Sequence, residues 1–156
     1  MRGLDRDEIN NVLTRQGIGV LSMAVGEQPY AIPMSFGYDT DQAILPMQWG
    51  SGYDGRKDAI IESNPNVCLT VYEQDTEAES IWRSVVITGK LFEIPEEQES
   101  QAYASLAANA TFAPDLGVWG IPFEDVEFRL FGLDTKDCTG REFSTGHGRR
   151  DAEAPD

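Results

Sequence analysis

The sequence predicts a single, mainly β domain in which antiparallel strands, with short helices between them, form a small closed or nearly closed barrel. Six segments carry the β-branched and aromatic composition of strands, and most are joined by short turns rich in Gly, Pro, Asn and Asp. The chain has 156 residues, which is enough for one sizeable core but not for two. No internal repeat or linker divides it, so we expect one domain over residues 1–143 and a polar, disordered tail over 144–156.

The expected elements follow from hydrophobic periodicity and from capping and turn residues. The strands are expected at 17–25, 29–39, 42–47, 67–73, 80–94 and 126–138, and the first three should form an antiparallel meander. A helix over about 5–16 is indicated by Asp5 and Glu8, which have the spacing of a capping box, and Gly17 should end it. Further helices are expected at 56–63 and from Pro95, at the first helical position, to about 108.

The charge of the chain excludes two classes of partner. Its formal net charge is −15, from 27 acidic against 12 basic residues, and only three of the basic residues are lysines. Such a surface repels nucleic-acid phosphates and anionic lipid headgroups, so we expect neither nucleic acid nor membrane as a partner. Many acids with few lysines favour a halophilic protein adapted to a salt-rich cytoplasm, and an ordinary acidic protein is the alternative.

Cysteine and histidine are too scarce for several kinds of chemistry. Cys68 and Cys138 cannot make a zinc cluster or a disulfide scaffold, and His147 is the only histidine. We therefore expect no metal site and no Ser-His hydrolysis, and no side chain is nominated as catalytic. No apolar run approaches the roughly 18 residues of a membrane span, and the polar first residues resemble no signal peptide, so the expected location is cytoplasmic.

The first candidate site is the start of the second predicted helix, where Arg56 and Lys57 follow Gly55. Free N–H groups and the helix dipole favour anions at such a position, and two adjacent cations would strengthen the attraction. Arginine can bind a phosphate with two hydrogen bonds, and lysine adds a point charge. The alternative is that both cations are solvated and balance Asp54 and Asp58.

The second candidate is the strand that contains Pro29 and Pro33. Proline cannot donate a hydrogen bond to a neighbouring strand, so this strand needs a sheet edge, a bulge or a ligand along it. Freed backbone groups could meet a heteroaromatic ring that carries its own donors and acceptors, and Ser35 could add a hydroxyl. An edge strand protected against aggregation is the alternative.

The third candidate is a polar pair in the fifth strand. Arg83 and Ser84 stand between Trp82 and the run Val85–Thr88, where a purely structural strand favours apolar residues. The alternative for Arg83 is an ion pair with an acid across the sheet.

Taken in order, these segments resemble the pyridoxamine 5′-phosphate oxidase-like, FMN-binding split-barrel family, in particular its nitroimidazole-resistance-like branch. The similar pieces extend over about residues 17–94: GIGVLSMAVGEQPYAIPMSFGYD, GRK before a helix, NPNVCLTV and WRSVVITGKLFEI. The resemblance implies a six-stranded antiparallel split β-barrel with short flanking helices. It also implies a homodimer that binds FMN at the subunit interface.

The resemblance assigns roles to the candidate residues. The strand residues Ala31, Ile32, Pro33, Met34, Ser35 and Phe36 would lie along the isoalloxazine ring. Arg56 and Lys57 would hold the phosphate, and Ser84, with Arg83, would approach the ring from the fifth strand. The chain departs from related sequences after the third strand, where a common histidine is missing from LPMQW (45–49), and in a longer loop before Gly55. Residues that bind pyridoxal phosphate in true oxidases are not recognisable, so vitamin B6 synthesis is not expected.

Size also argues for a dimer, because a barrel of about 130 residues fills its interior with side chains. A flavin needs several hundred Å³ and would have to lie in an outer groove that a partner covers. The apolar residues around the candidate site exceed what one barrel face can bury: Tyr30, Ile32, Met34, Phe36, Trp49 and Trp82. The alternative is that these residues fill the barrel core.

The sequence therefore predicts an FMN-dependent oxidoreductase with an unknown small-molecule substrate. Three alternatives stay open: a non-enzymatic flavin-binding or sensing protein, the same barrel binding haem or a deazaflavin coenzyme, and an interaction barrel without a ligand.

Overall fold

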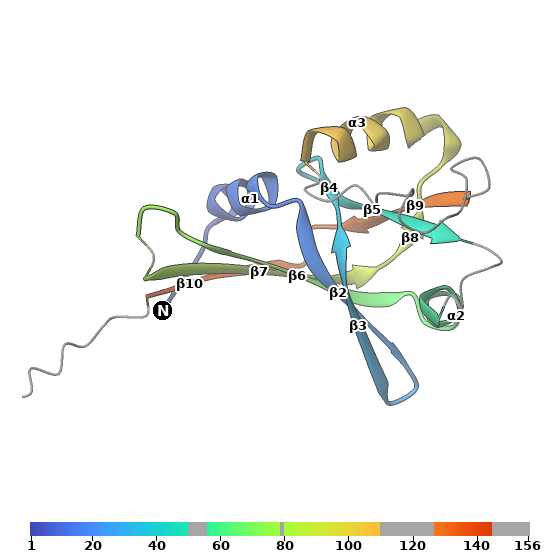
Figure 1. Ribbon diagram of the computed structural model, residues 1–156, viewed down its shortest axis with the longest axis horizontal. Helices are drawn as coiled ribbons and strands as arrows, with labels where there is room; N and C mark the ends of the chain where they lie inside the picture. Colours follow the sequence, from blue (N-terminus) through green and yellow to red (C-terminus); the bar gives the residue numbers. More distant parts are fainter. Residues whose placement is uncertain (50–55, 79, 110–126, 145–156) are drawn as a thin grey trace, which may run out of the picture.

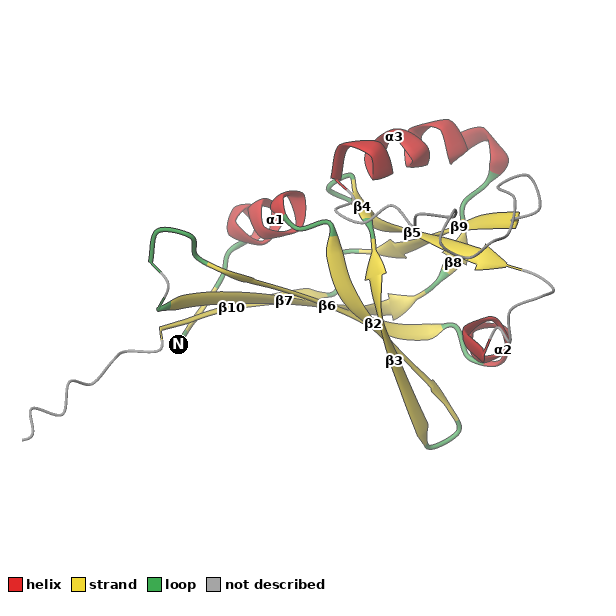
Figure 2. Ribbon diagram, in the orientation of Figure 1, coloured by secondary structure: helices red, strands yellow, loops and turns green. Residues whose placement is uncertain are grey.

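The computed structural model describes residues 1–49, 56–78, 80–109 and 127–144, which form two antiparallel sheets with helices beside them (Figures 1 and 2). The six-stranded sheet has the order β1-β10-β7-β6-β2-β3, and the four-stranded sheet has the order β4-β5-β9-β8. Neither sheet closes on itself within the described residues. The mainly antiparallel β fold expected from the sequence is confirmed, as an open, split arrangement.

The elements have the following bounds. The strands are β1 (Arg2–Gly3), β2 (Ile18–Val25), β3 (Gln28–Ser35), β4 (Gly37–Tyr38), β5 (Gln42–Trp49), β6 (Asn66–Gln74), β7 (Ile81–Lys90), β8 (Phe92–Glu93), β9 (Glu127–Asp134) and β10 (Cys138–Ser144). The helices are α1 (Arg6–Arg15), α2 (Arg56–Ser63), the 3₁₀ turn η1 (Glu96–Gln98) and α3 (Glu99–Asn109).

The first helix begins where the capping box predicts. The Asp5 side chain accepts a hydrogen bond from the Glu8 N–H, and the Glu8 side chain accepts one from the Asp5 N–H, which satisfies both otherwise free donors. Val12 and Leu13 on one face of α1 are fully buried against the six-stranded sheet. The third helix differs from the expectation, because Pro95 precedes the η1 turn and α3 begins only at Glu99.

Two predicted strands are each divided between the sheets. The segment 29–39 breaks at Phe36, and the segment 80–94 breaks at Leu91. Both side chains are buried in the core, so the chain turns there from the six-stranded to the four-stranded sheet. Close packing marks the first break, since a Cβ on Gly37 would lie 2.7 Å from the Leu106 backbone nitrogen of α3.

The first three predicted strands pair in the expected antiparallel order, because the segment 29–39 pairs with β2 through β3 and with β5 through β4, but this meander is divided between the two sheets. β2 and β3 form a hairpin whose turn contains Gly26 in a left-handed conformation (φ 56°). However, β5 pairs with β4 and β9 and belongs to the other sheet, because the chain changes sheets at Phe36.

A strand that the sequence analysis missed, β10, pairs with β7 from Cys138 opposite Ile87 to Ser144 opposite Ile81. Its polar composition hides it, because one of its faces is exposed and the other meets charged partners. The predicted tail lies outside the described residues beyond Ser144, as do the glycine-rich loop over 50–55 and most of the predicted connection over 109–124.

The core lies between the two sheets. Alternate residues of the central strands point into it, so that Leu21, Leu69 and Ile87 form one buried row across β2, β6 and β7. The intervening residues of these strands make the opposite, outer face of the six-stranded sheet, and they are exposed or half-buried.

Candidate functional site

The strand with the two prolines lies at an open edge. Among the described residues, β3 pairs with β2 alone, with Pro29 opposite Ala24 and Pro33 opposite Val20. Just past the strand, the Phe36 N–H donates to the Gly17 carbonyl, so the backbone groups of even-numbered residues point toward β2. The odd-numbered residues therefore turn their backbone outward, where proline loses no ladder hydrogen bond. Of the edge, bulge or ligand that the prolines require, the structure shows an edge.

This edge presents backbone rather than large side chains. The exposed side chains of β3 include Ala31 and Pro33, which are small and carry no polar group. The outward backbone groups there are the Ala31 N–H and the carbonyls of Pro29, Ala31 and Pro33. The edge is thus a shallow strip with one N–H donor between two prolines and acceptors on both sides of it.

The other predicted ring contacts face inward. Tyr30, Ile32 and Met34 are half-buried and pack against the core, and Ser35 is buried. Phe36 is fully buried, its N–H donates to Gly17, and its carbonyl accepts a hydrogen bond from the Asn109 side chain (3.2 Å). Phe36 therefore fills the core, which was the alternative given for this residue in the sequence analysis.

The predicted anion-binding cations lie at the start of α2, a helix that packs on β2. Arg56 and Lys57 are the first two residues of α2, and the Lys57 Nζ lies 3.7 Å from the Asp58 Oδ1, near the limit of an ion pair. Past the helix, the Asn64 side chain donates to the Ala24 carbonyl (3.0 Å), and Ala24 pairs with Pro29 of β3. This contact and the packing of α2 on β2 hold the helix next to the β2–β3 hairpin.

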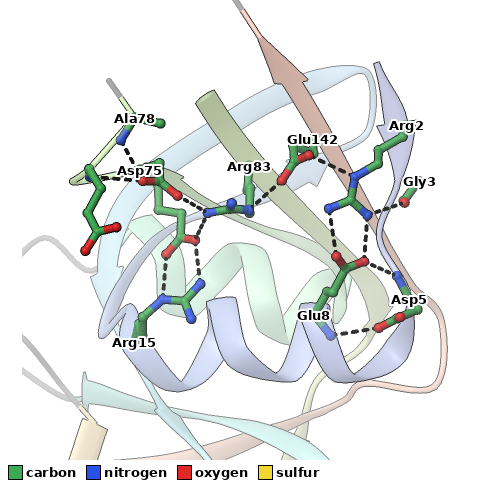
Figure 3. Close-up of polar contacts among 11 residues, drawn as sticks. Arg2, Gly3, Asp5, Glu8, Arg15, Asp75, Ala78, Arg83 and Glu142 are labelled. Carbon is green, nitrogen blue, oxygen red and sulfur yellow. Dashed lines mark hydrogen bonds and ion pairs between the residues drawn. The ribbon is translucent and has the colours of Figure 1, made fainter. Parts of the chain in front are cut away.

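The two polar residues of β7 lie on opposite faces of the sheet. Because side chains alternate along a strand, Arg83 shares the inner side with Val85 and Ile87, and Ser84 lies on the outer face. Arg83 donates to Glu142 (2.8 Å) and Asp75 (3.0 Å), as Figure 3 shows, and also to Glu73 (3.2 Å). Arg83 therefore pairs with acids across the sheet, which was the alternative given for it in the sequence analysis.

Arg83 belongs to a larger network of arginines and carboxylates (Figure 3). Glu73 is only 7% exposed and also accepts two hydrogen bonds from Arg15 (2.6 and 3.1 Å). Arg2 of β1 donates to Glu8 (2.7 and 2.9 Å) and to Glu142 (2.8 Å). The network joins β1, α1, β6, β7 and β10, and part of it lines an open groove of about 470 Å³.

The arginines shift the ionisation of these acids. Hydrogen bonds from Arg2 lower the pKa of Glu8 to about 2 and also lower the pKa of Glu142. Burial alone would raise the pKa of Glu73, but the hydrogen bonds and charge of Arg15 outweigh it, and the pKa lies below its ordinary value. The acids of the network are therefore ionised at neutral pH, and four carboxylates share three arginines: Arg2, Arg15 and Arg83. Arg15 and Glu73, and Arg83 and Glu142, lie 58 and 59 residues apart, so no local pattern signals these two pairs.

The outer face around Ser84 carries exposed aromatic side chains beside polar ones, and the exposed Arg141 of β10 pairs with Ser84. Ser84 pairs with Tyr72 of β6, and the Tyr72 and Trp82 rings contact each other at 6.4 Å between centroids. Tyr72 is 61% exposed, and Ile18 and Phe143 on the same face are also exposed. We call Ile18, Tyr72, Trp82, Ser84 and Phe143 the outer-face patch. In Figure 2, α1 lies over the opposite side of these strands, and no described element covers the patch.

Two further features bear on function. Among the described residues, no three His, Cys, Asp or Glu side chains come together as ligands for a metal ion. No helix in the described ranges is long and apolar enough to cross a membrane.

The open pair of antiparallel sheets, with a strand edge and an uncovered outer face, defines a split β-barrel protein. The family model described as pyridoxamine 5′-phosphate oxidase matches residues 5–118, and the chain belongs to this family. This finding confirms the resemblance seen in the sequence.

Solved structures of the same fold include a FAD-binding and a haem-binding protein. A FAD-binding protein of Mesorhizobium loti is 25% identical, with a TM-score of 0.71, and the match covers 92% of this chain and 98% of that one. A candidate 5-nitroimidazole antibiotic resistance protein of Bacteroides thetaiotaomicron is 21% identical, with a TM-score of 0.66 over 91% and 87% of the two chains. A haem-binding protein of Mycobacterium smegmatis is 17% identical, with a TM-score of 0.62 over 96% and 57%.

A curated relative adds no activity. An uncharacterised protein of Rhizobium meliloti is 26% identical over 98 residues, which are 63% of this chain and 60% of that protein. The chain thus spans less than two thirds of the curated relative that it matches.

Proposed function

We propose that the chain binds FMN between two copies of itself and acts as an oxidoreductase on a small molecule. The observation that carries the proposal is the open edge of β3, in a hairpin whose other strand, β2, packs against a helix that begins with two cations. Flavin-binding proteins of the same fold support a flavin as the ligand. FMN as the particular flavin, the dimer and the oxidoreductase activity are what we propose.

The edge of β3 suits the polar side of a flavin ring. An isoalloxazine ring carries carbonyl acceptors and an N–H donor along one edge. The Ala31 N–H can donate to the ring, and the carbonyls of Pro29 or Ala31 can accept from it, without disturbing the β2–β3 ladder. The exposed Ala31 and Pro33 side chains are small enough to let a flat ring approach the backbone.

The start of α2 suits a phosphate. Arg56 and Lys57 are adjacent at a helix N-terminus, in a chain whose formal net charge is −15. Backbone N–H groups and the helix dipole add to the attraction. One phosphate at one helix start favours FMN over riboflavin, which has none.

A second copy would cover what one chain leaves open. The outer-face patch exposes Tyr72 and Phe143 on the sheet that ends at β3. A twofold contact would bury the patch and create two equivalent sites. Ser84 lies within the patch and would then approach the ring, while Arg83 on the other face would stay in its network.

The flavin would supply the redox chemistry when bound, and this chain would bind and orient it and exclude water from one ring face. A haem in the same fold is the second candidate, because the neighbour from Mycobacterium smegmatis binds haem. Haem iron is commonly held by an axial histidine, and the sequence offers a single histidine, His147, for that role. This scarcity favours the flavin over haem.

The absorption spectrum of the purified protein tests the proposed cofactor. Recovery of the protein from a cytoplasmic extract tests the cytoplasmic location, which is also part of the proposal. Absorption bands at about 370 and about 450 nm, as in free flavins, together with release of FMN on denaturation, support FMN binding. A Soret band or a spectrum without a chromophore after incubation with FMN contradicts it. Bleaching of the flavin band by NADH or NADPH would separate an oxidoreductase from a binding or sensing protein.

A further inference from the structure

The edge of β3 and Ser84 are both assigned to the flavin site, but they lie far apart in one chain. Two strands, β2 and β6, stand between β3 and β7 in the sheet (Figure 1). The register places Ala31 of β3 in one row with Ser22, Cys68 and Thr88 of β2, β6 and β7. This row crosses three strand spacings of about 4.8 Å, so Thr88 lies about 14 Å from Ala31.

Ser84 is further from Ala31 than Thr88 is. It precedes Thr88 by four residues of β7, which adds about 13 Å along the strand at about 3.3 Å per residue. The two displacements are perpendicular, so the backbones of Ala31 and Ser84 are separated by about 20 Å. Even Ser35, at the end of β3, is buried and lies three strands from β7.

The direction of the free backbone groups adds to this separation. The outward N–H and carbonyl of Ala31 point away from β2, and therefore away from β7. A ring held by these groups lies beyond the edge of the sheet. Three fused six-membered rings are much shorter than the distance that remains, so a flavin ring at this edge cannot contact Ser84 of the same chain.

The outer face of the six-stranded sheet is a surface that a second copy can approach. The chain has a formal net charge of −15, so two copies repel each other. However, the side chains that the described strands β2, β6, β7 and β10 turn to this face include no acid, and the charged ones are the cations Lys90 and Arg141. The acids of these strands, Glu73 and Glu142, point to the other face and join the arginine network. Two outer faces can therefore meet without bringing acids together.

We infer that each flavin site takes the edge of β3 from one copy and Ser84 from the partner subunit, an inference that rests on the proposed function. A twofold contact repeats the arrangement at the second site. Tyr72 and Trp82 share the outer-face patch with Ser84, so they would come with it and cover the ring. One chain alone then has no complete site.

A heterodimer of two blocked variants tests this inference. Ala31→Trp and Ser84→Trp each add bulk on the outer face of the sheet, where no described element packs, and each alone should weaken FMN binding at least about tenfold. The two variants are co-expressed with different affinity tags, and the heterodimer is purified through both tags. One of its sites then carries both substitutions and the other carries neither. It should bind one FMN per dimer with the affinity of the wild type, measured by fluorescence titration.

A heterodimer of Ala31→Trp and Pro33→Trp is the matched control. Both substitutions lie in β3, so every site carries one of them whichever copy supplies Ser84, and no FMN should bind with wild-type affinity. Light scattering checks that each variant is a dimer. If Ser84→Trp does not form dimers, Ser84→Val takes its place, with an expected loss of affinity of about two- to tenfold.

The inference would be overturned if the heterodimer of Ala31→Trp and Ser84→Trp had no site of wild-type affinity, because each site would then be built from one chain. Unchanged FMN affinity in the Ser84 variant would also overturn it, and in both cases flavin binding at β3 would stand. A wild-type protein that binds no flavin, or that binds it as a single chain, would overturn the proposed function itself.

Discussion

Arg83 and Ser84 are neighbours in the chain but lie on opposite faces of β7, and this geometry predicts opposite effects of replacing them. Arg83→Met keeps the aliphatic stem and removes the guanidinium. It should destabilise the fold and leave FMN affinity unchanged. Ser84→Ala removes a hydroxyl from the outer-face patch. It should weaken FMN binding and leave stability unchanged.

The size of the Arg83 effect follows from its contacts. The guanidinium makes three hydrogen bonds to carboxylates, and its side chain is 21% exposed. Each acid keeps a second partner after the substitution: Glu73 keeps Arg15, Glu142 keeps Arg2, and Asp75 keeps the Ala78 N–H. Asp75 loses its cation but keeps backbone donors, and the buried Glu73 keeps Arg15, so the full penalty of a broken buried pair does not apply. We expect about 1–3 kcal/mol of lost stability, or a melting temperature lower by about 2–4 °C for each kcal/mol.

The Ser84 effect is that of one neutral hydrogen bond. It should raise the dissociation constant of FMN by about two- to tenfold and change the unfolding free energy by less than about 0.5 kcal/mol. Urea unfolding of the apoprotein and fluorescence titration with FMN measure the two quantities on the same samples.

The reasoning would be refuted if Arg83→Met left stability unchanged and weakened FMN binding, because Arg83 would then contact the cofactor and not the network. An unchanged FMN affinity in Ser84→Ala would remove Ser84, but not β3 or α2, from the site.

Three further predictions concern charge. Replacing both Arg56 and Lys57 with alanine should weaken FMN binding much more than riboflavin binding, by about 1.5–3 kcal/mol for each contact, and equal losses in fluorescence titrations would show that neither binds phosphate. Because the pKa of Glu8 is lowered from 4.5 to about 2, the stability that its ionised form supplies is present above pH 4.5 and is lost as the pH falls through about 2. Acid unfolding of Glu8→Gln followed by circular dichroism should therefore show a weaker dependence on pH than wild type in that window, and parallel curves would contradict the pairing with Arg2. If the net charge of −15 reflects halophilic adaptation, the melting temperature should rise steeply as KCl increases from tenths molar to molar, since the Debye length at 0.1 M is about 10 Å, and a flat profile would reject that interpretation.

Local signals in the sequence predicted local structure well. Asp5 and Glu8 marked the start of α1 because a capping box acts within one helical turn. Pro29 and Pro33 marked the edge strand because a missing N–H restricts where a strand can lie, whatever surrounds it. Features that depend only on neighbouring residues can be recognised in a single sequence.

What the sequence could not show depends on residues that are distant in the chain. Phe36 and Leu91 look like ordinary strand residues, and only the packing of one sheet on the other makes them the points where the chain changes sheets. Arg83 finds Glu73 and Glu142 through pairing with β6 and β10, and the second of these strands was not expected. Alternation along β7 would have separated Arg83 from Ser84, but the family resemblance favoured treating them together.

The central claim is that two copies of the chain hold the flavin between them. Light scattering on the flavin-loaded protein in high salt, with absorbance recorded at about 450 nm, measures the mass and the bound flavin in one peak. The account predicts the mass of two chains and two flavins for each dimer, because the outer-face patch and the β3 edge are both open in one chain. A peak with the mass of one chain and with flavin still bound would contradict it.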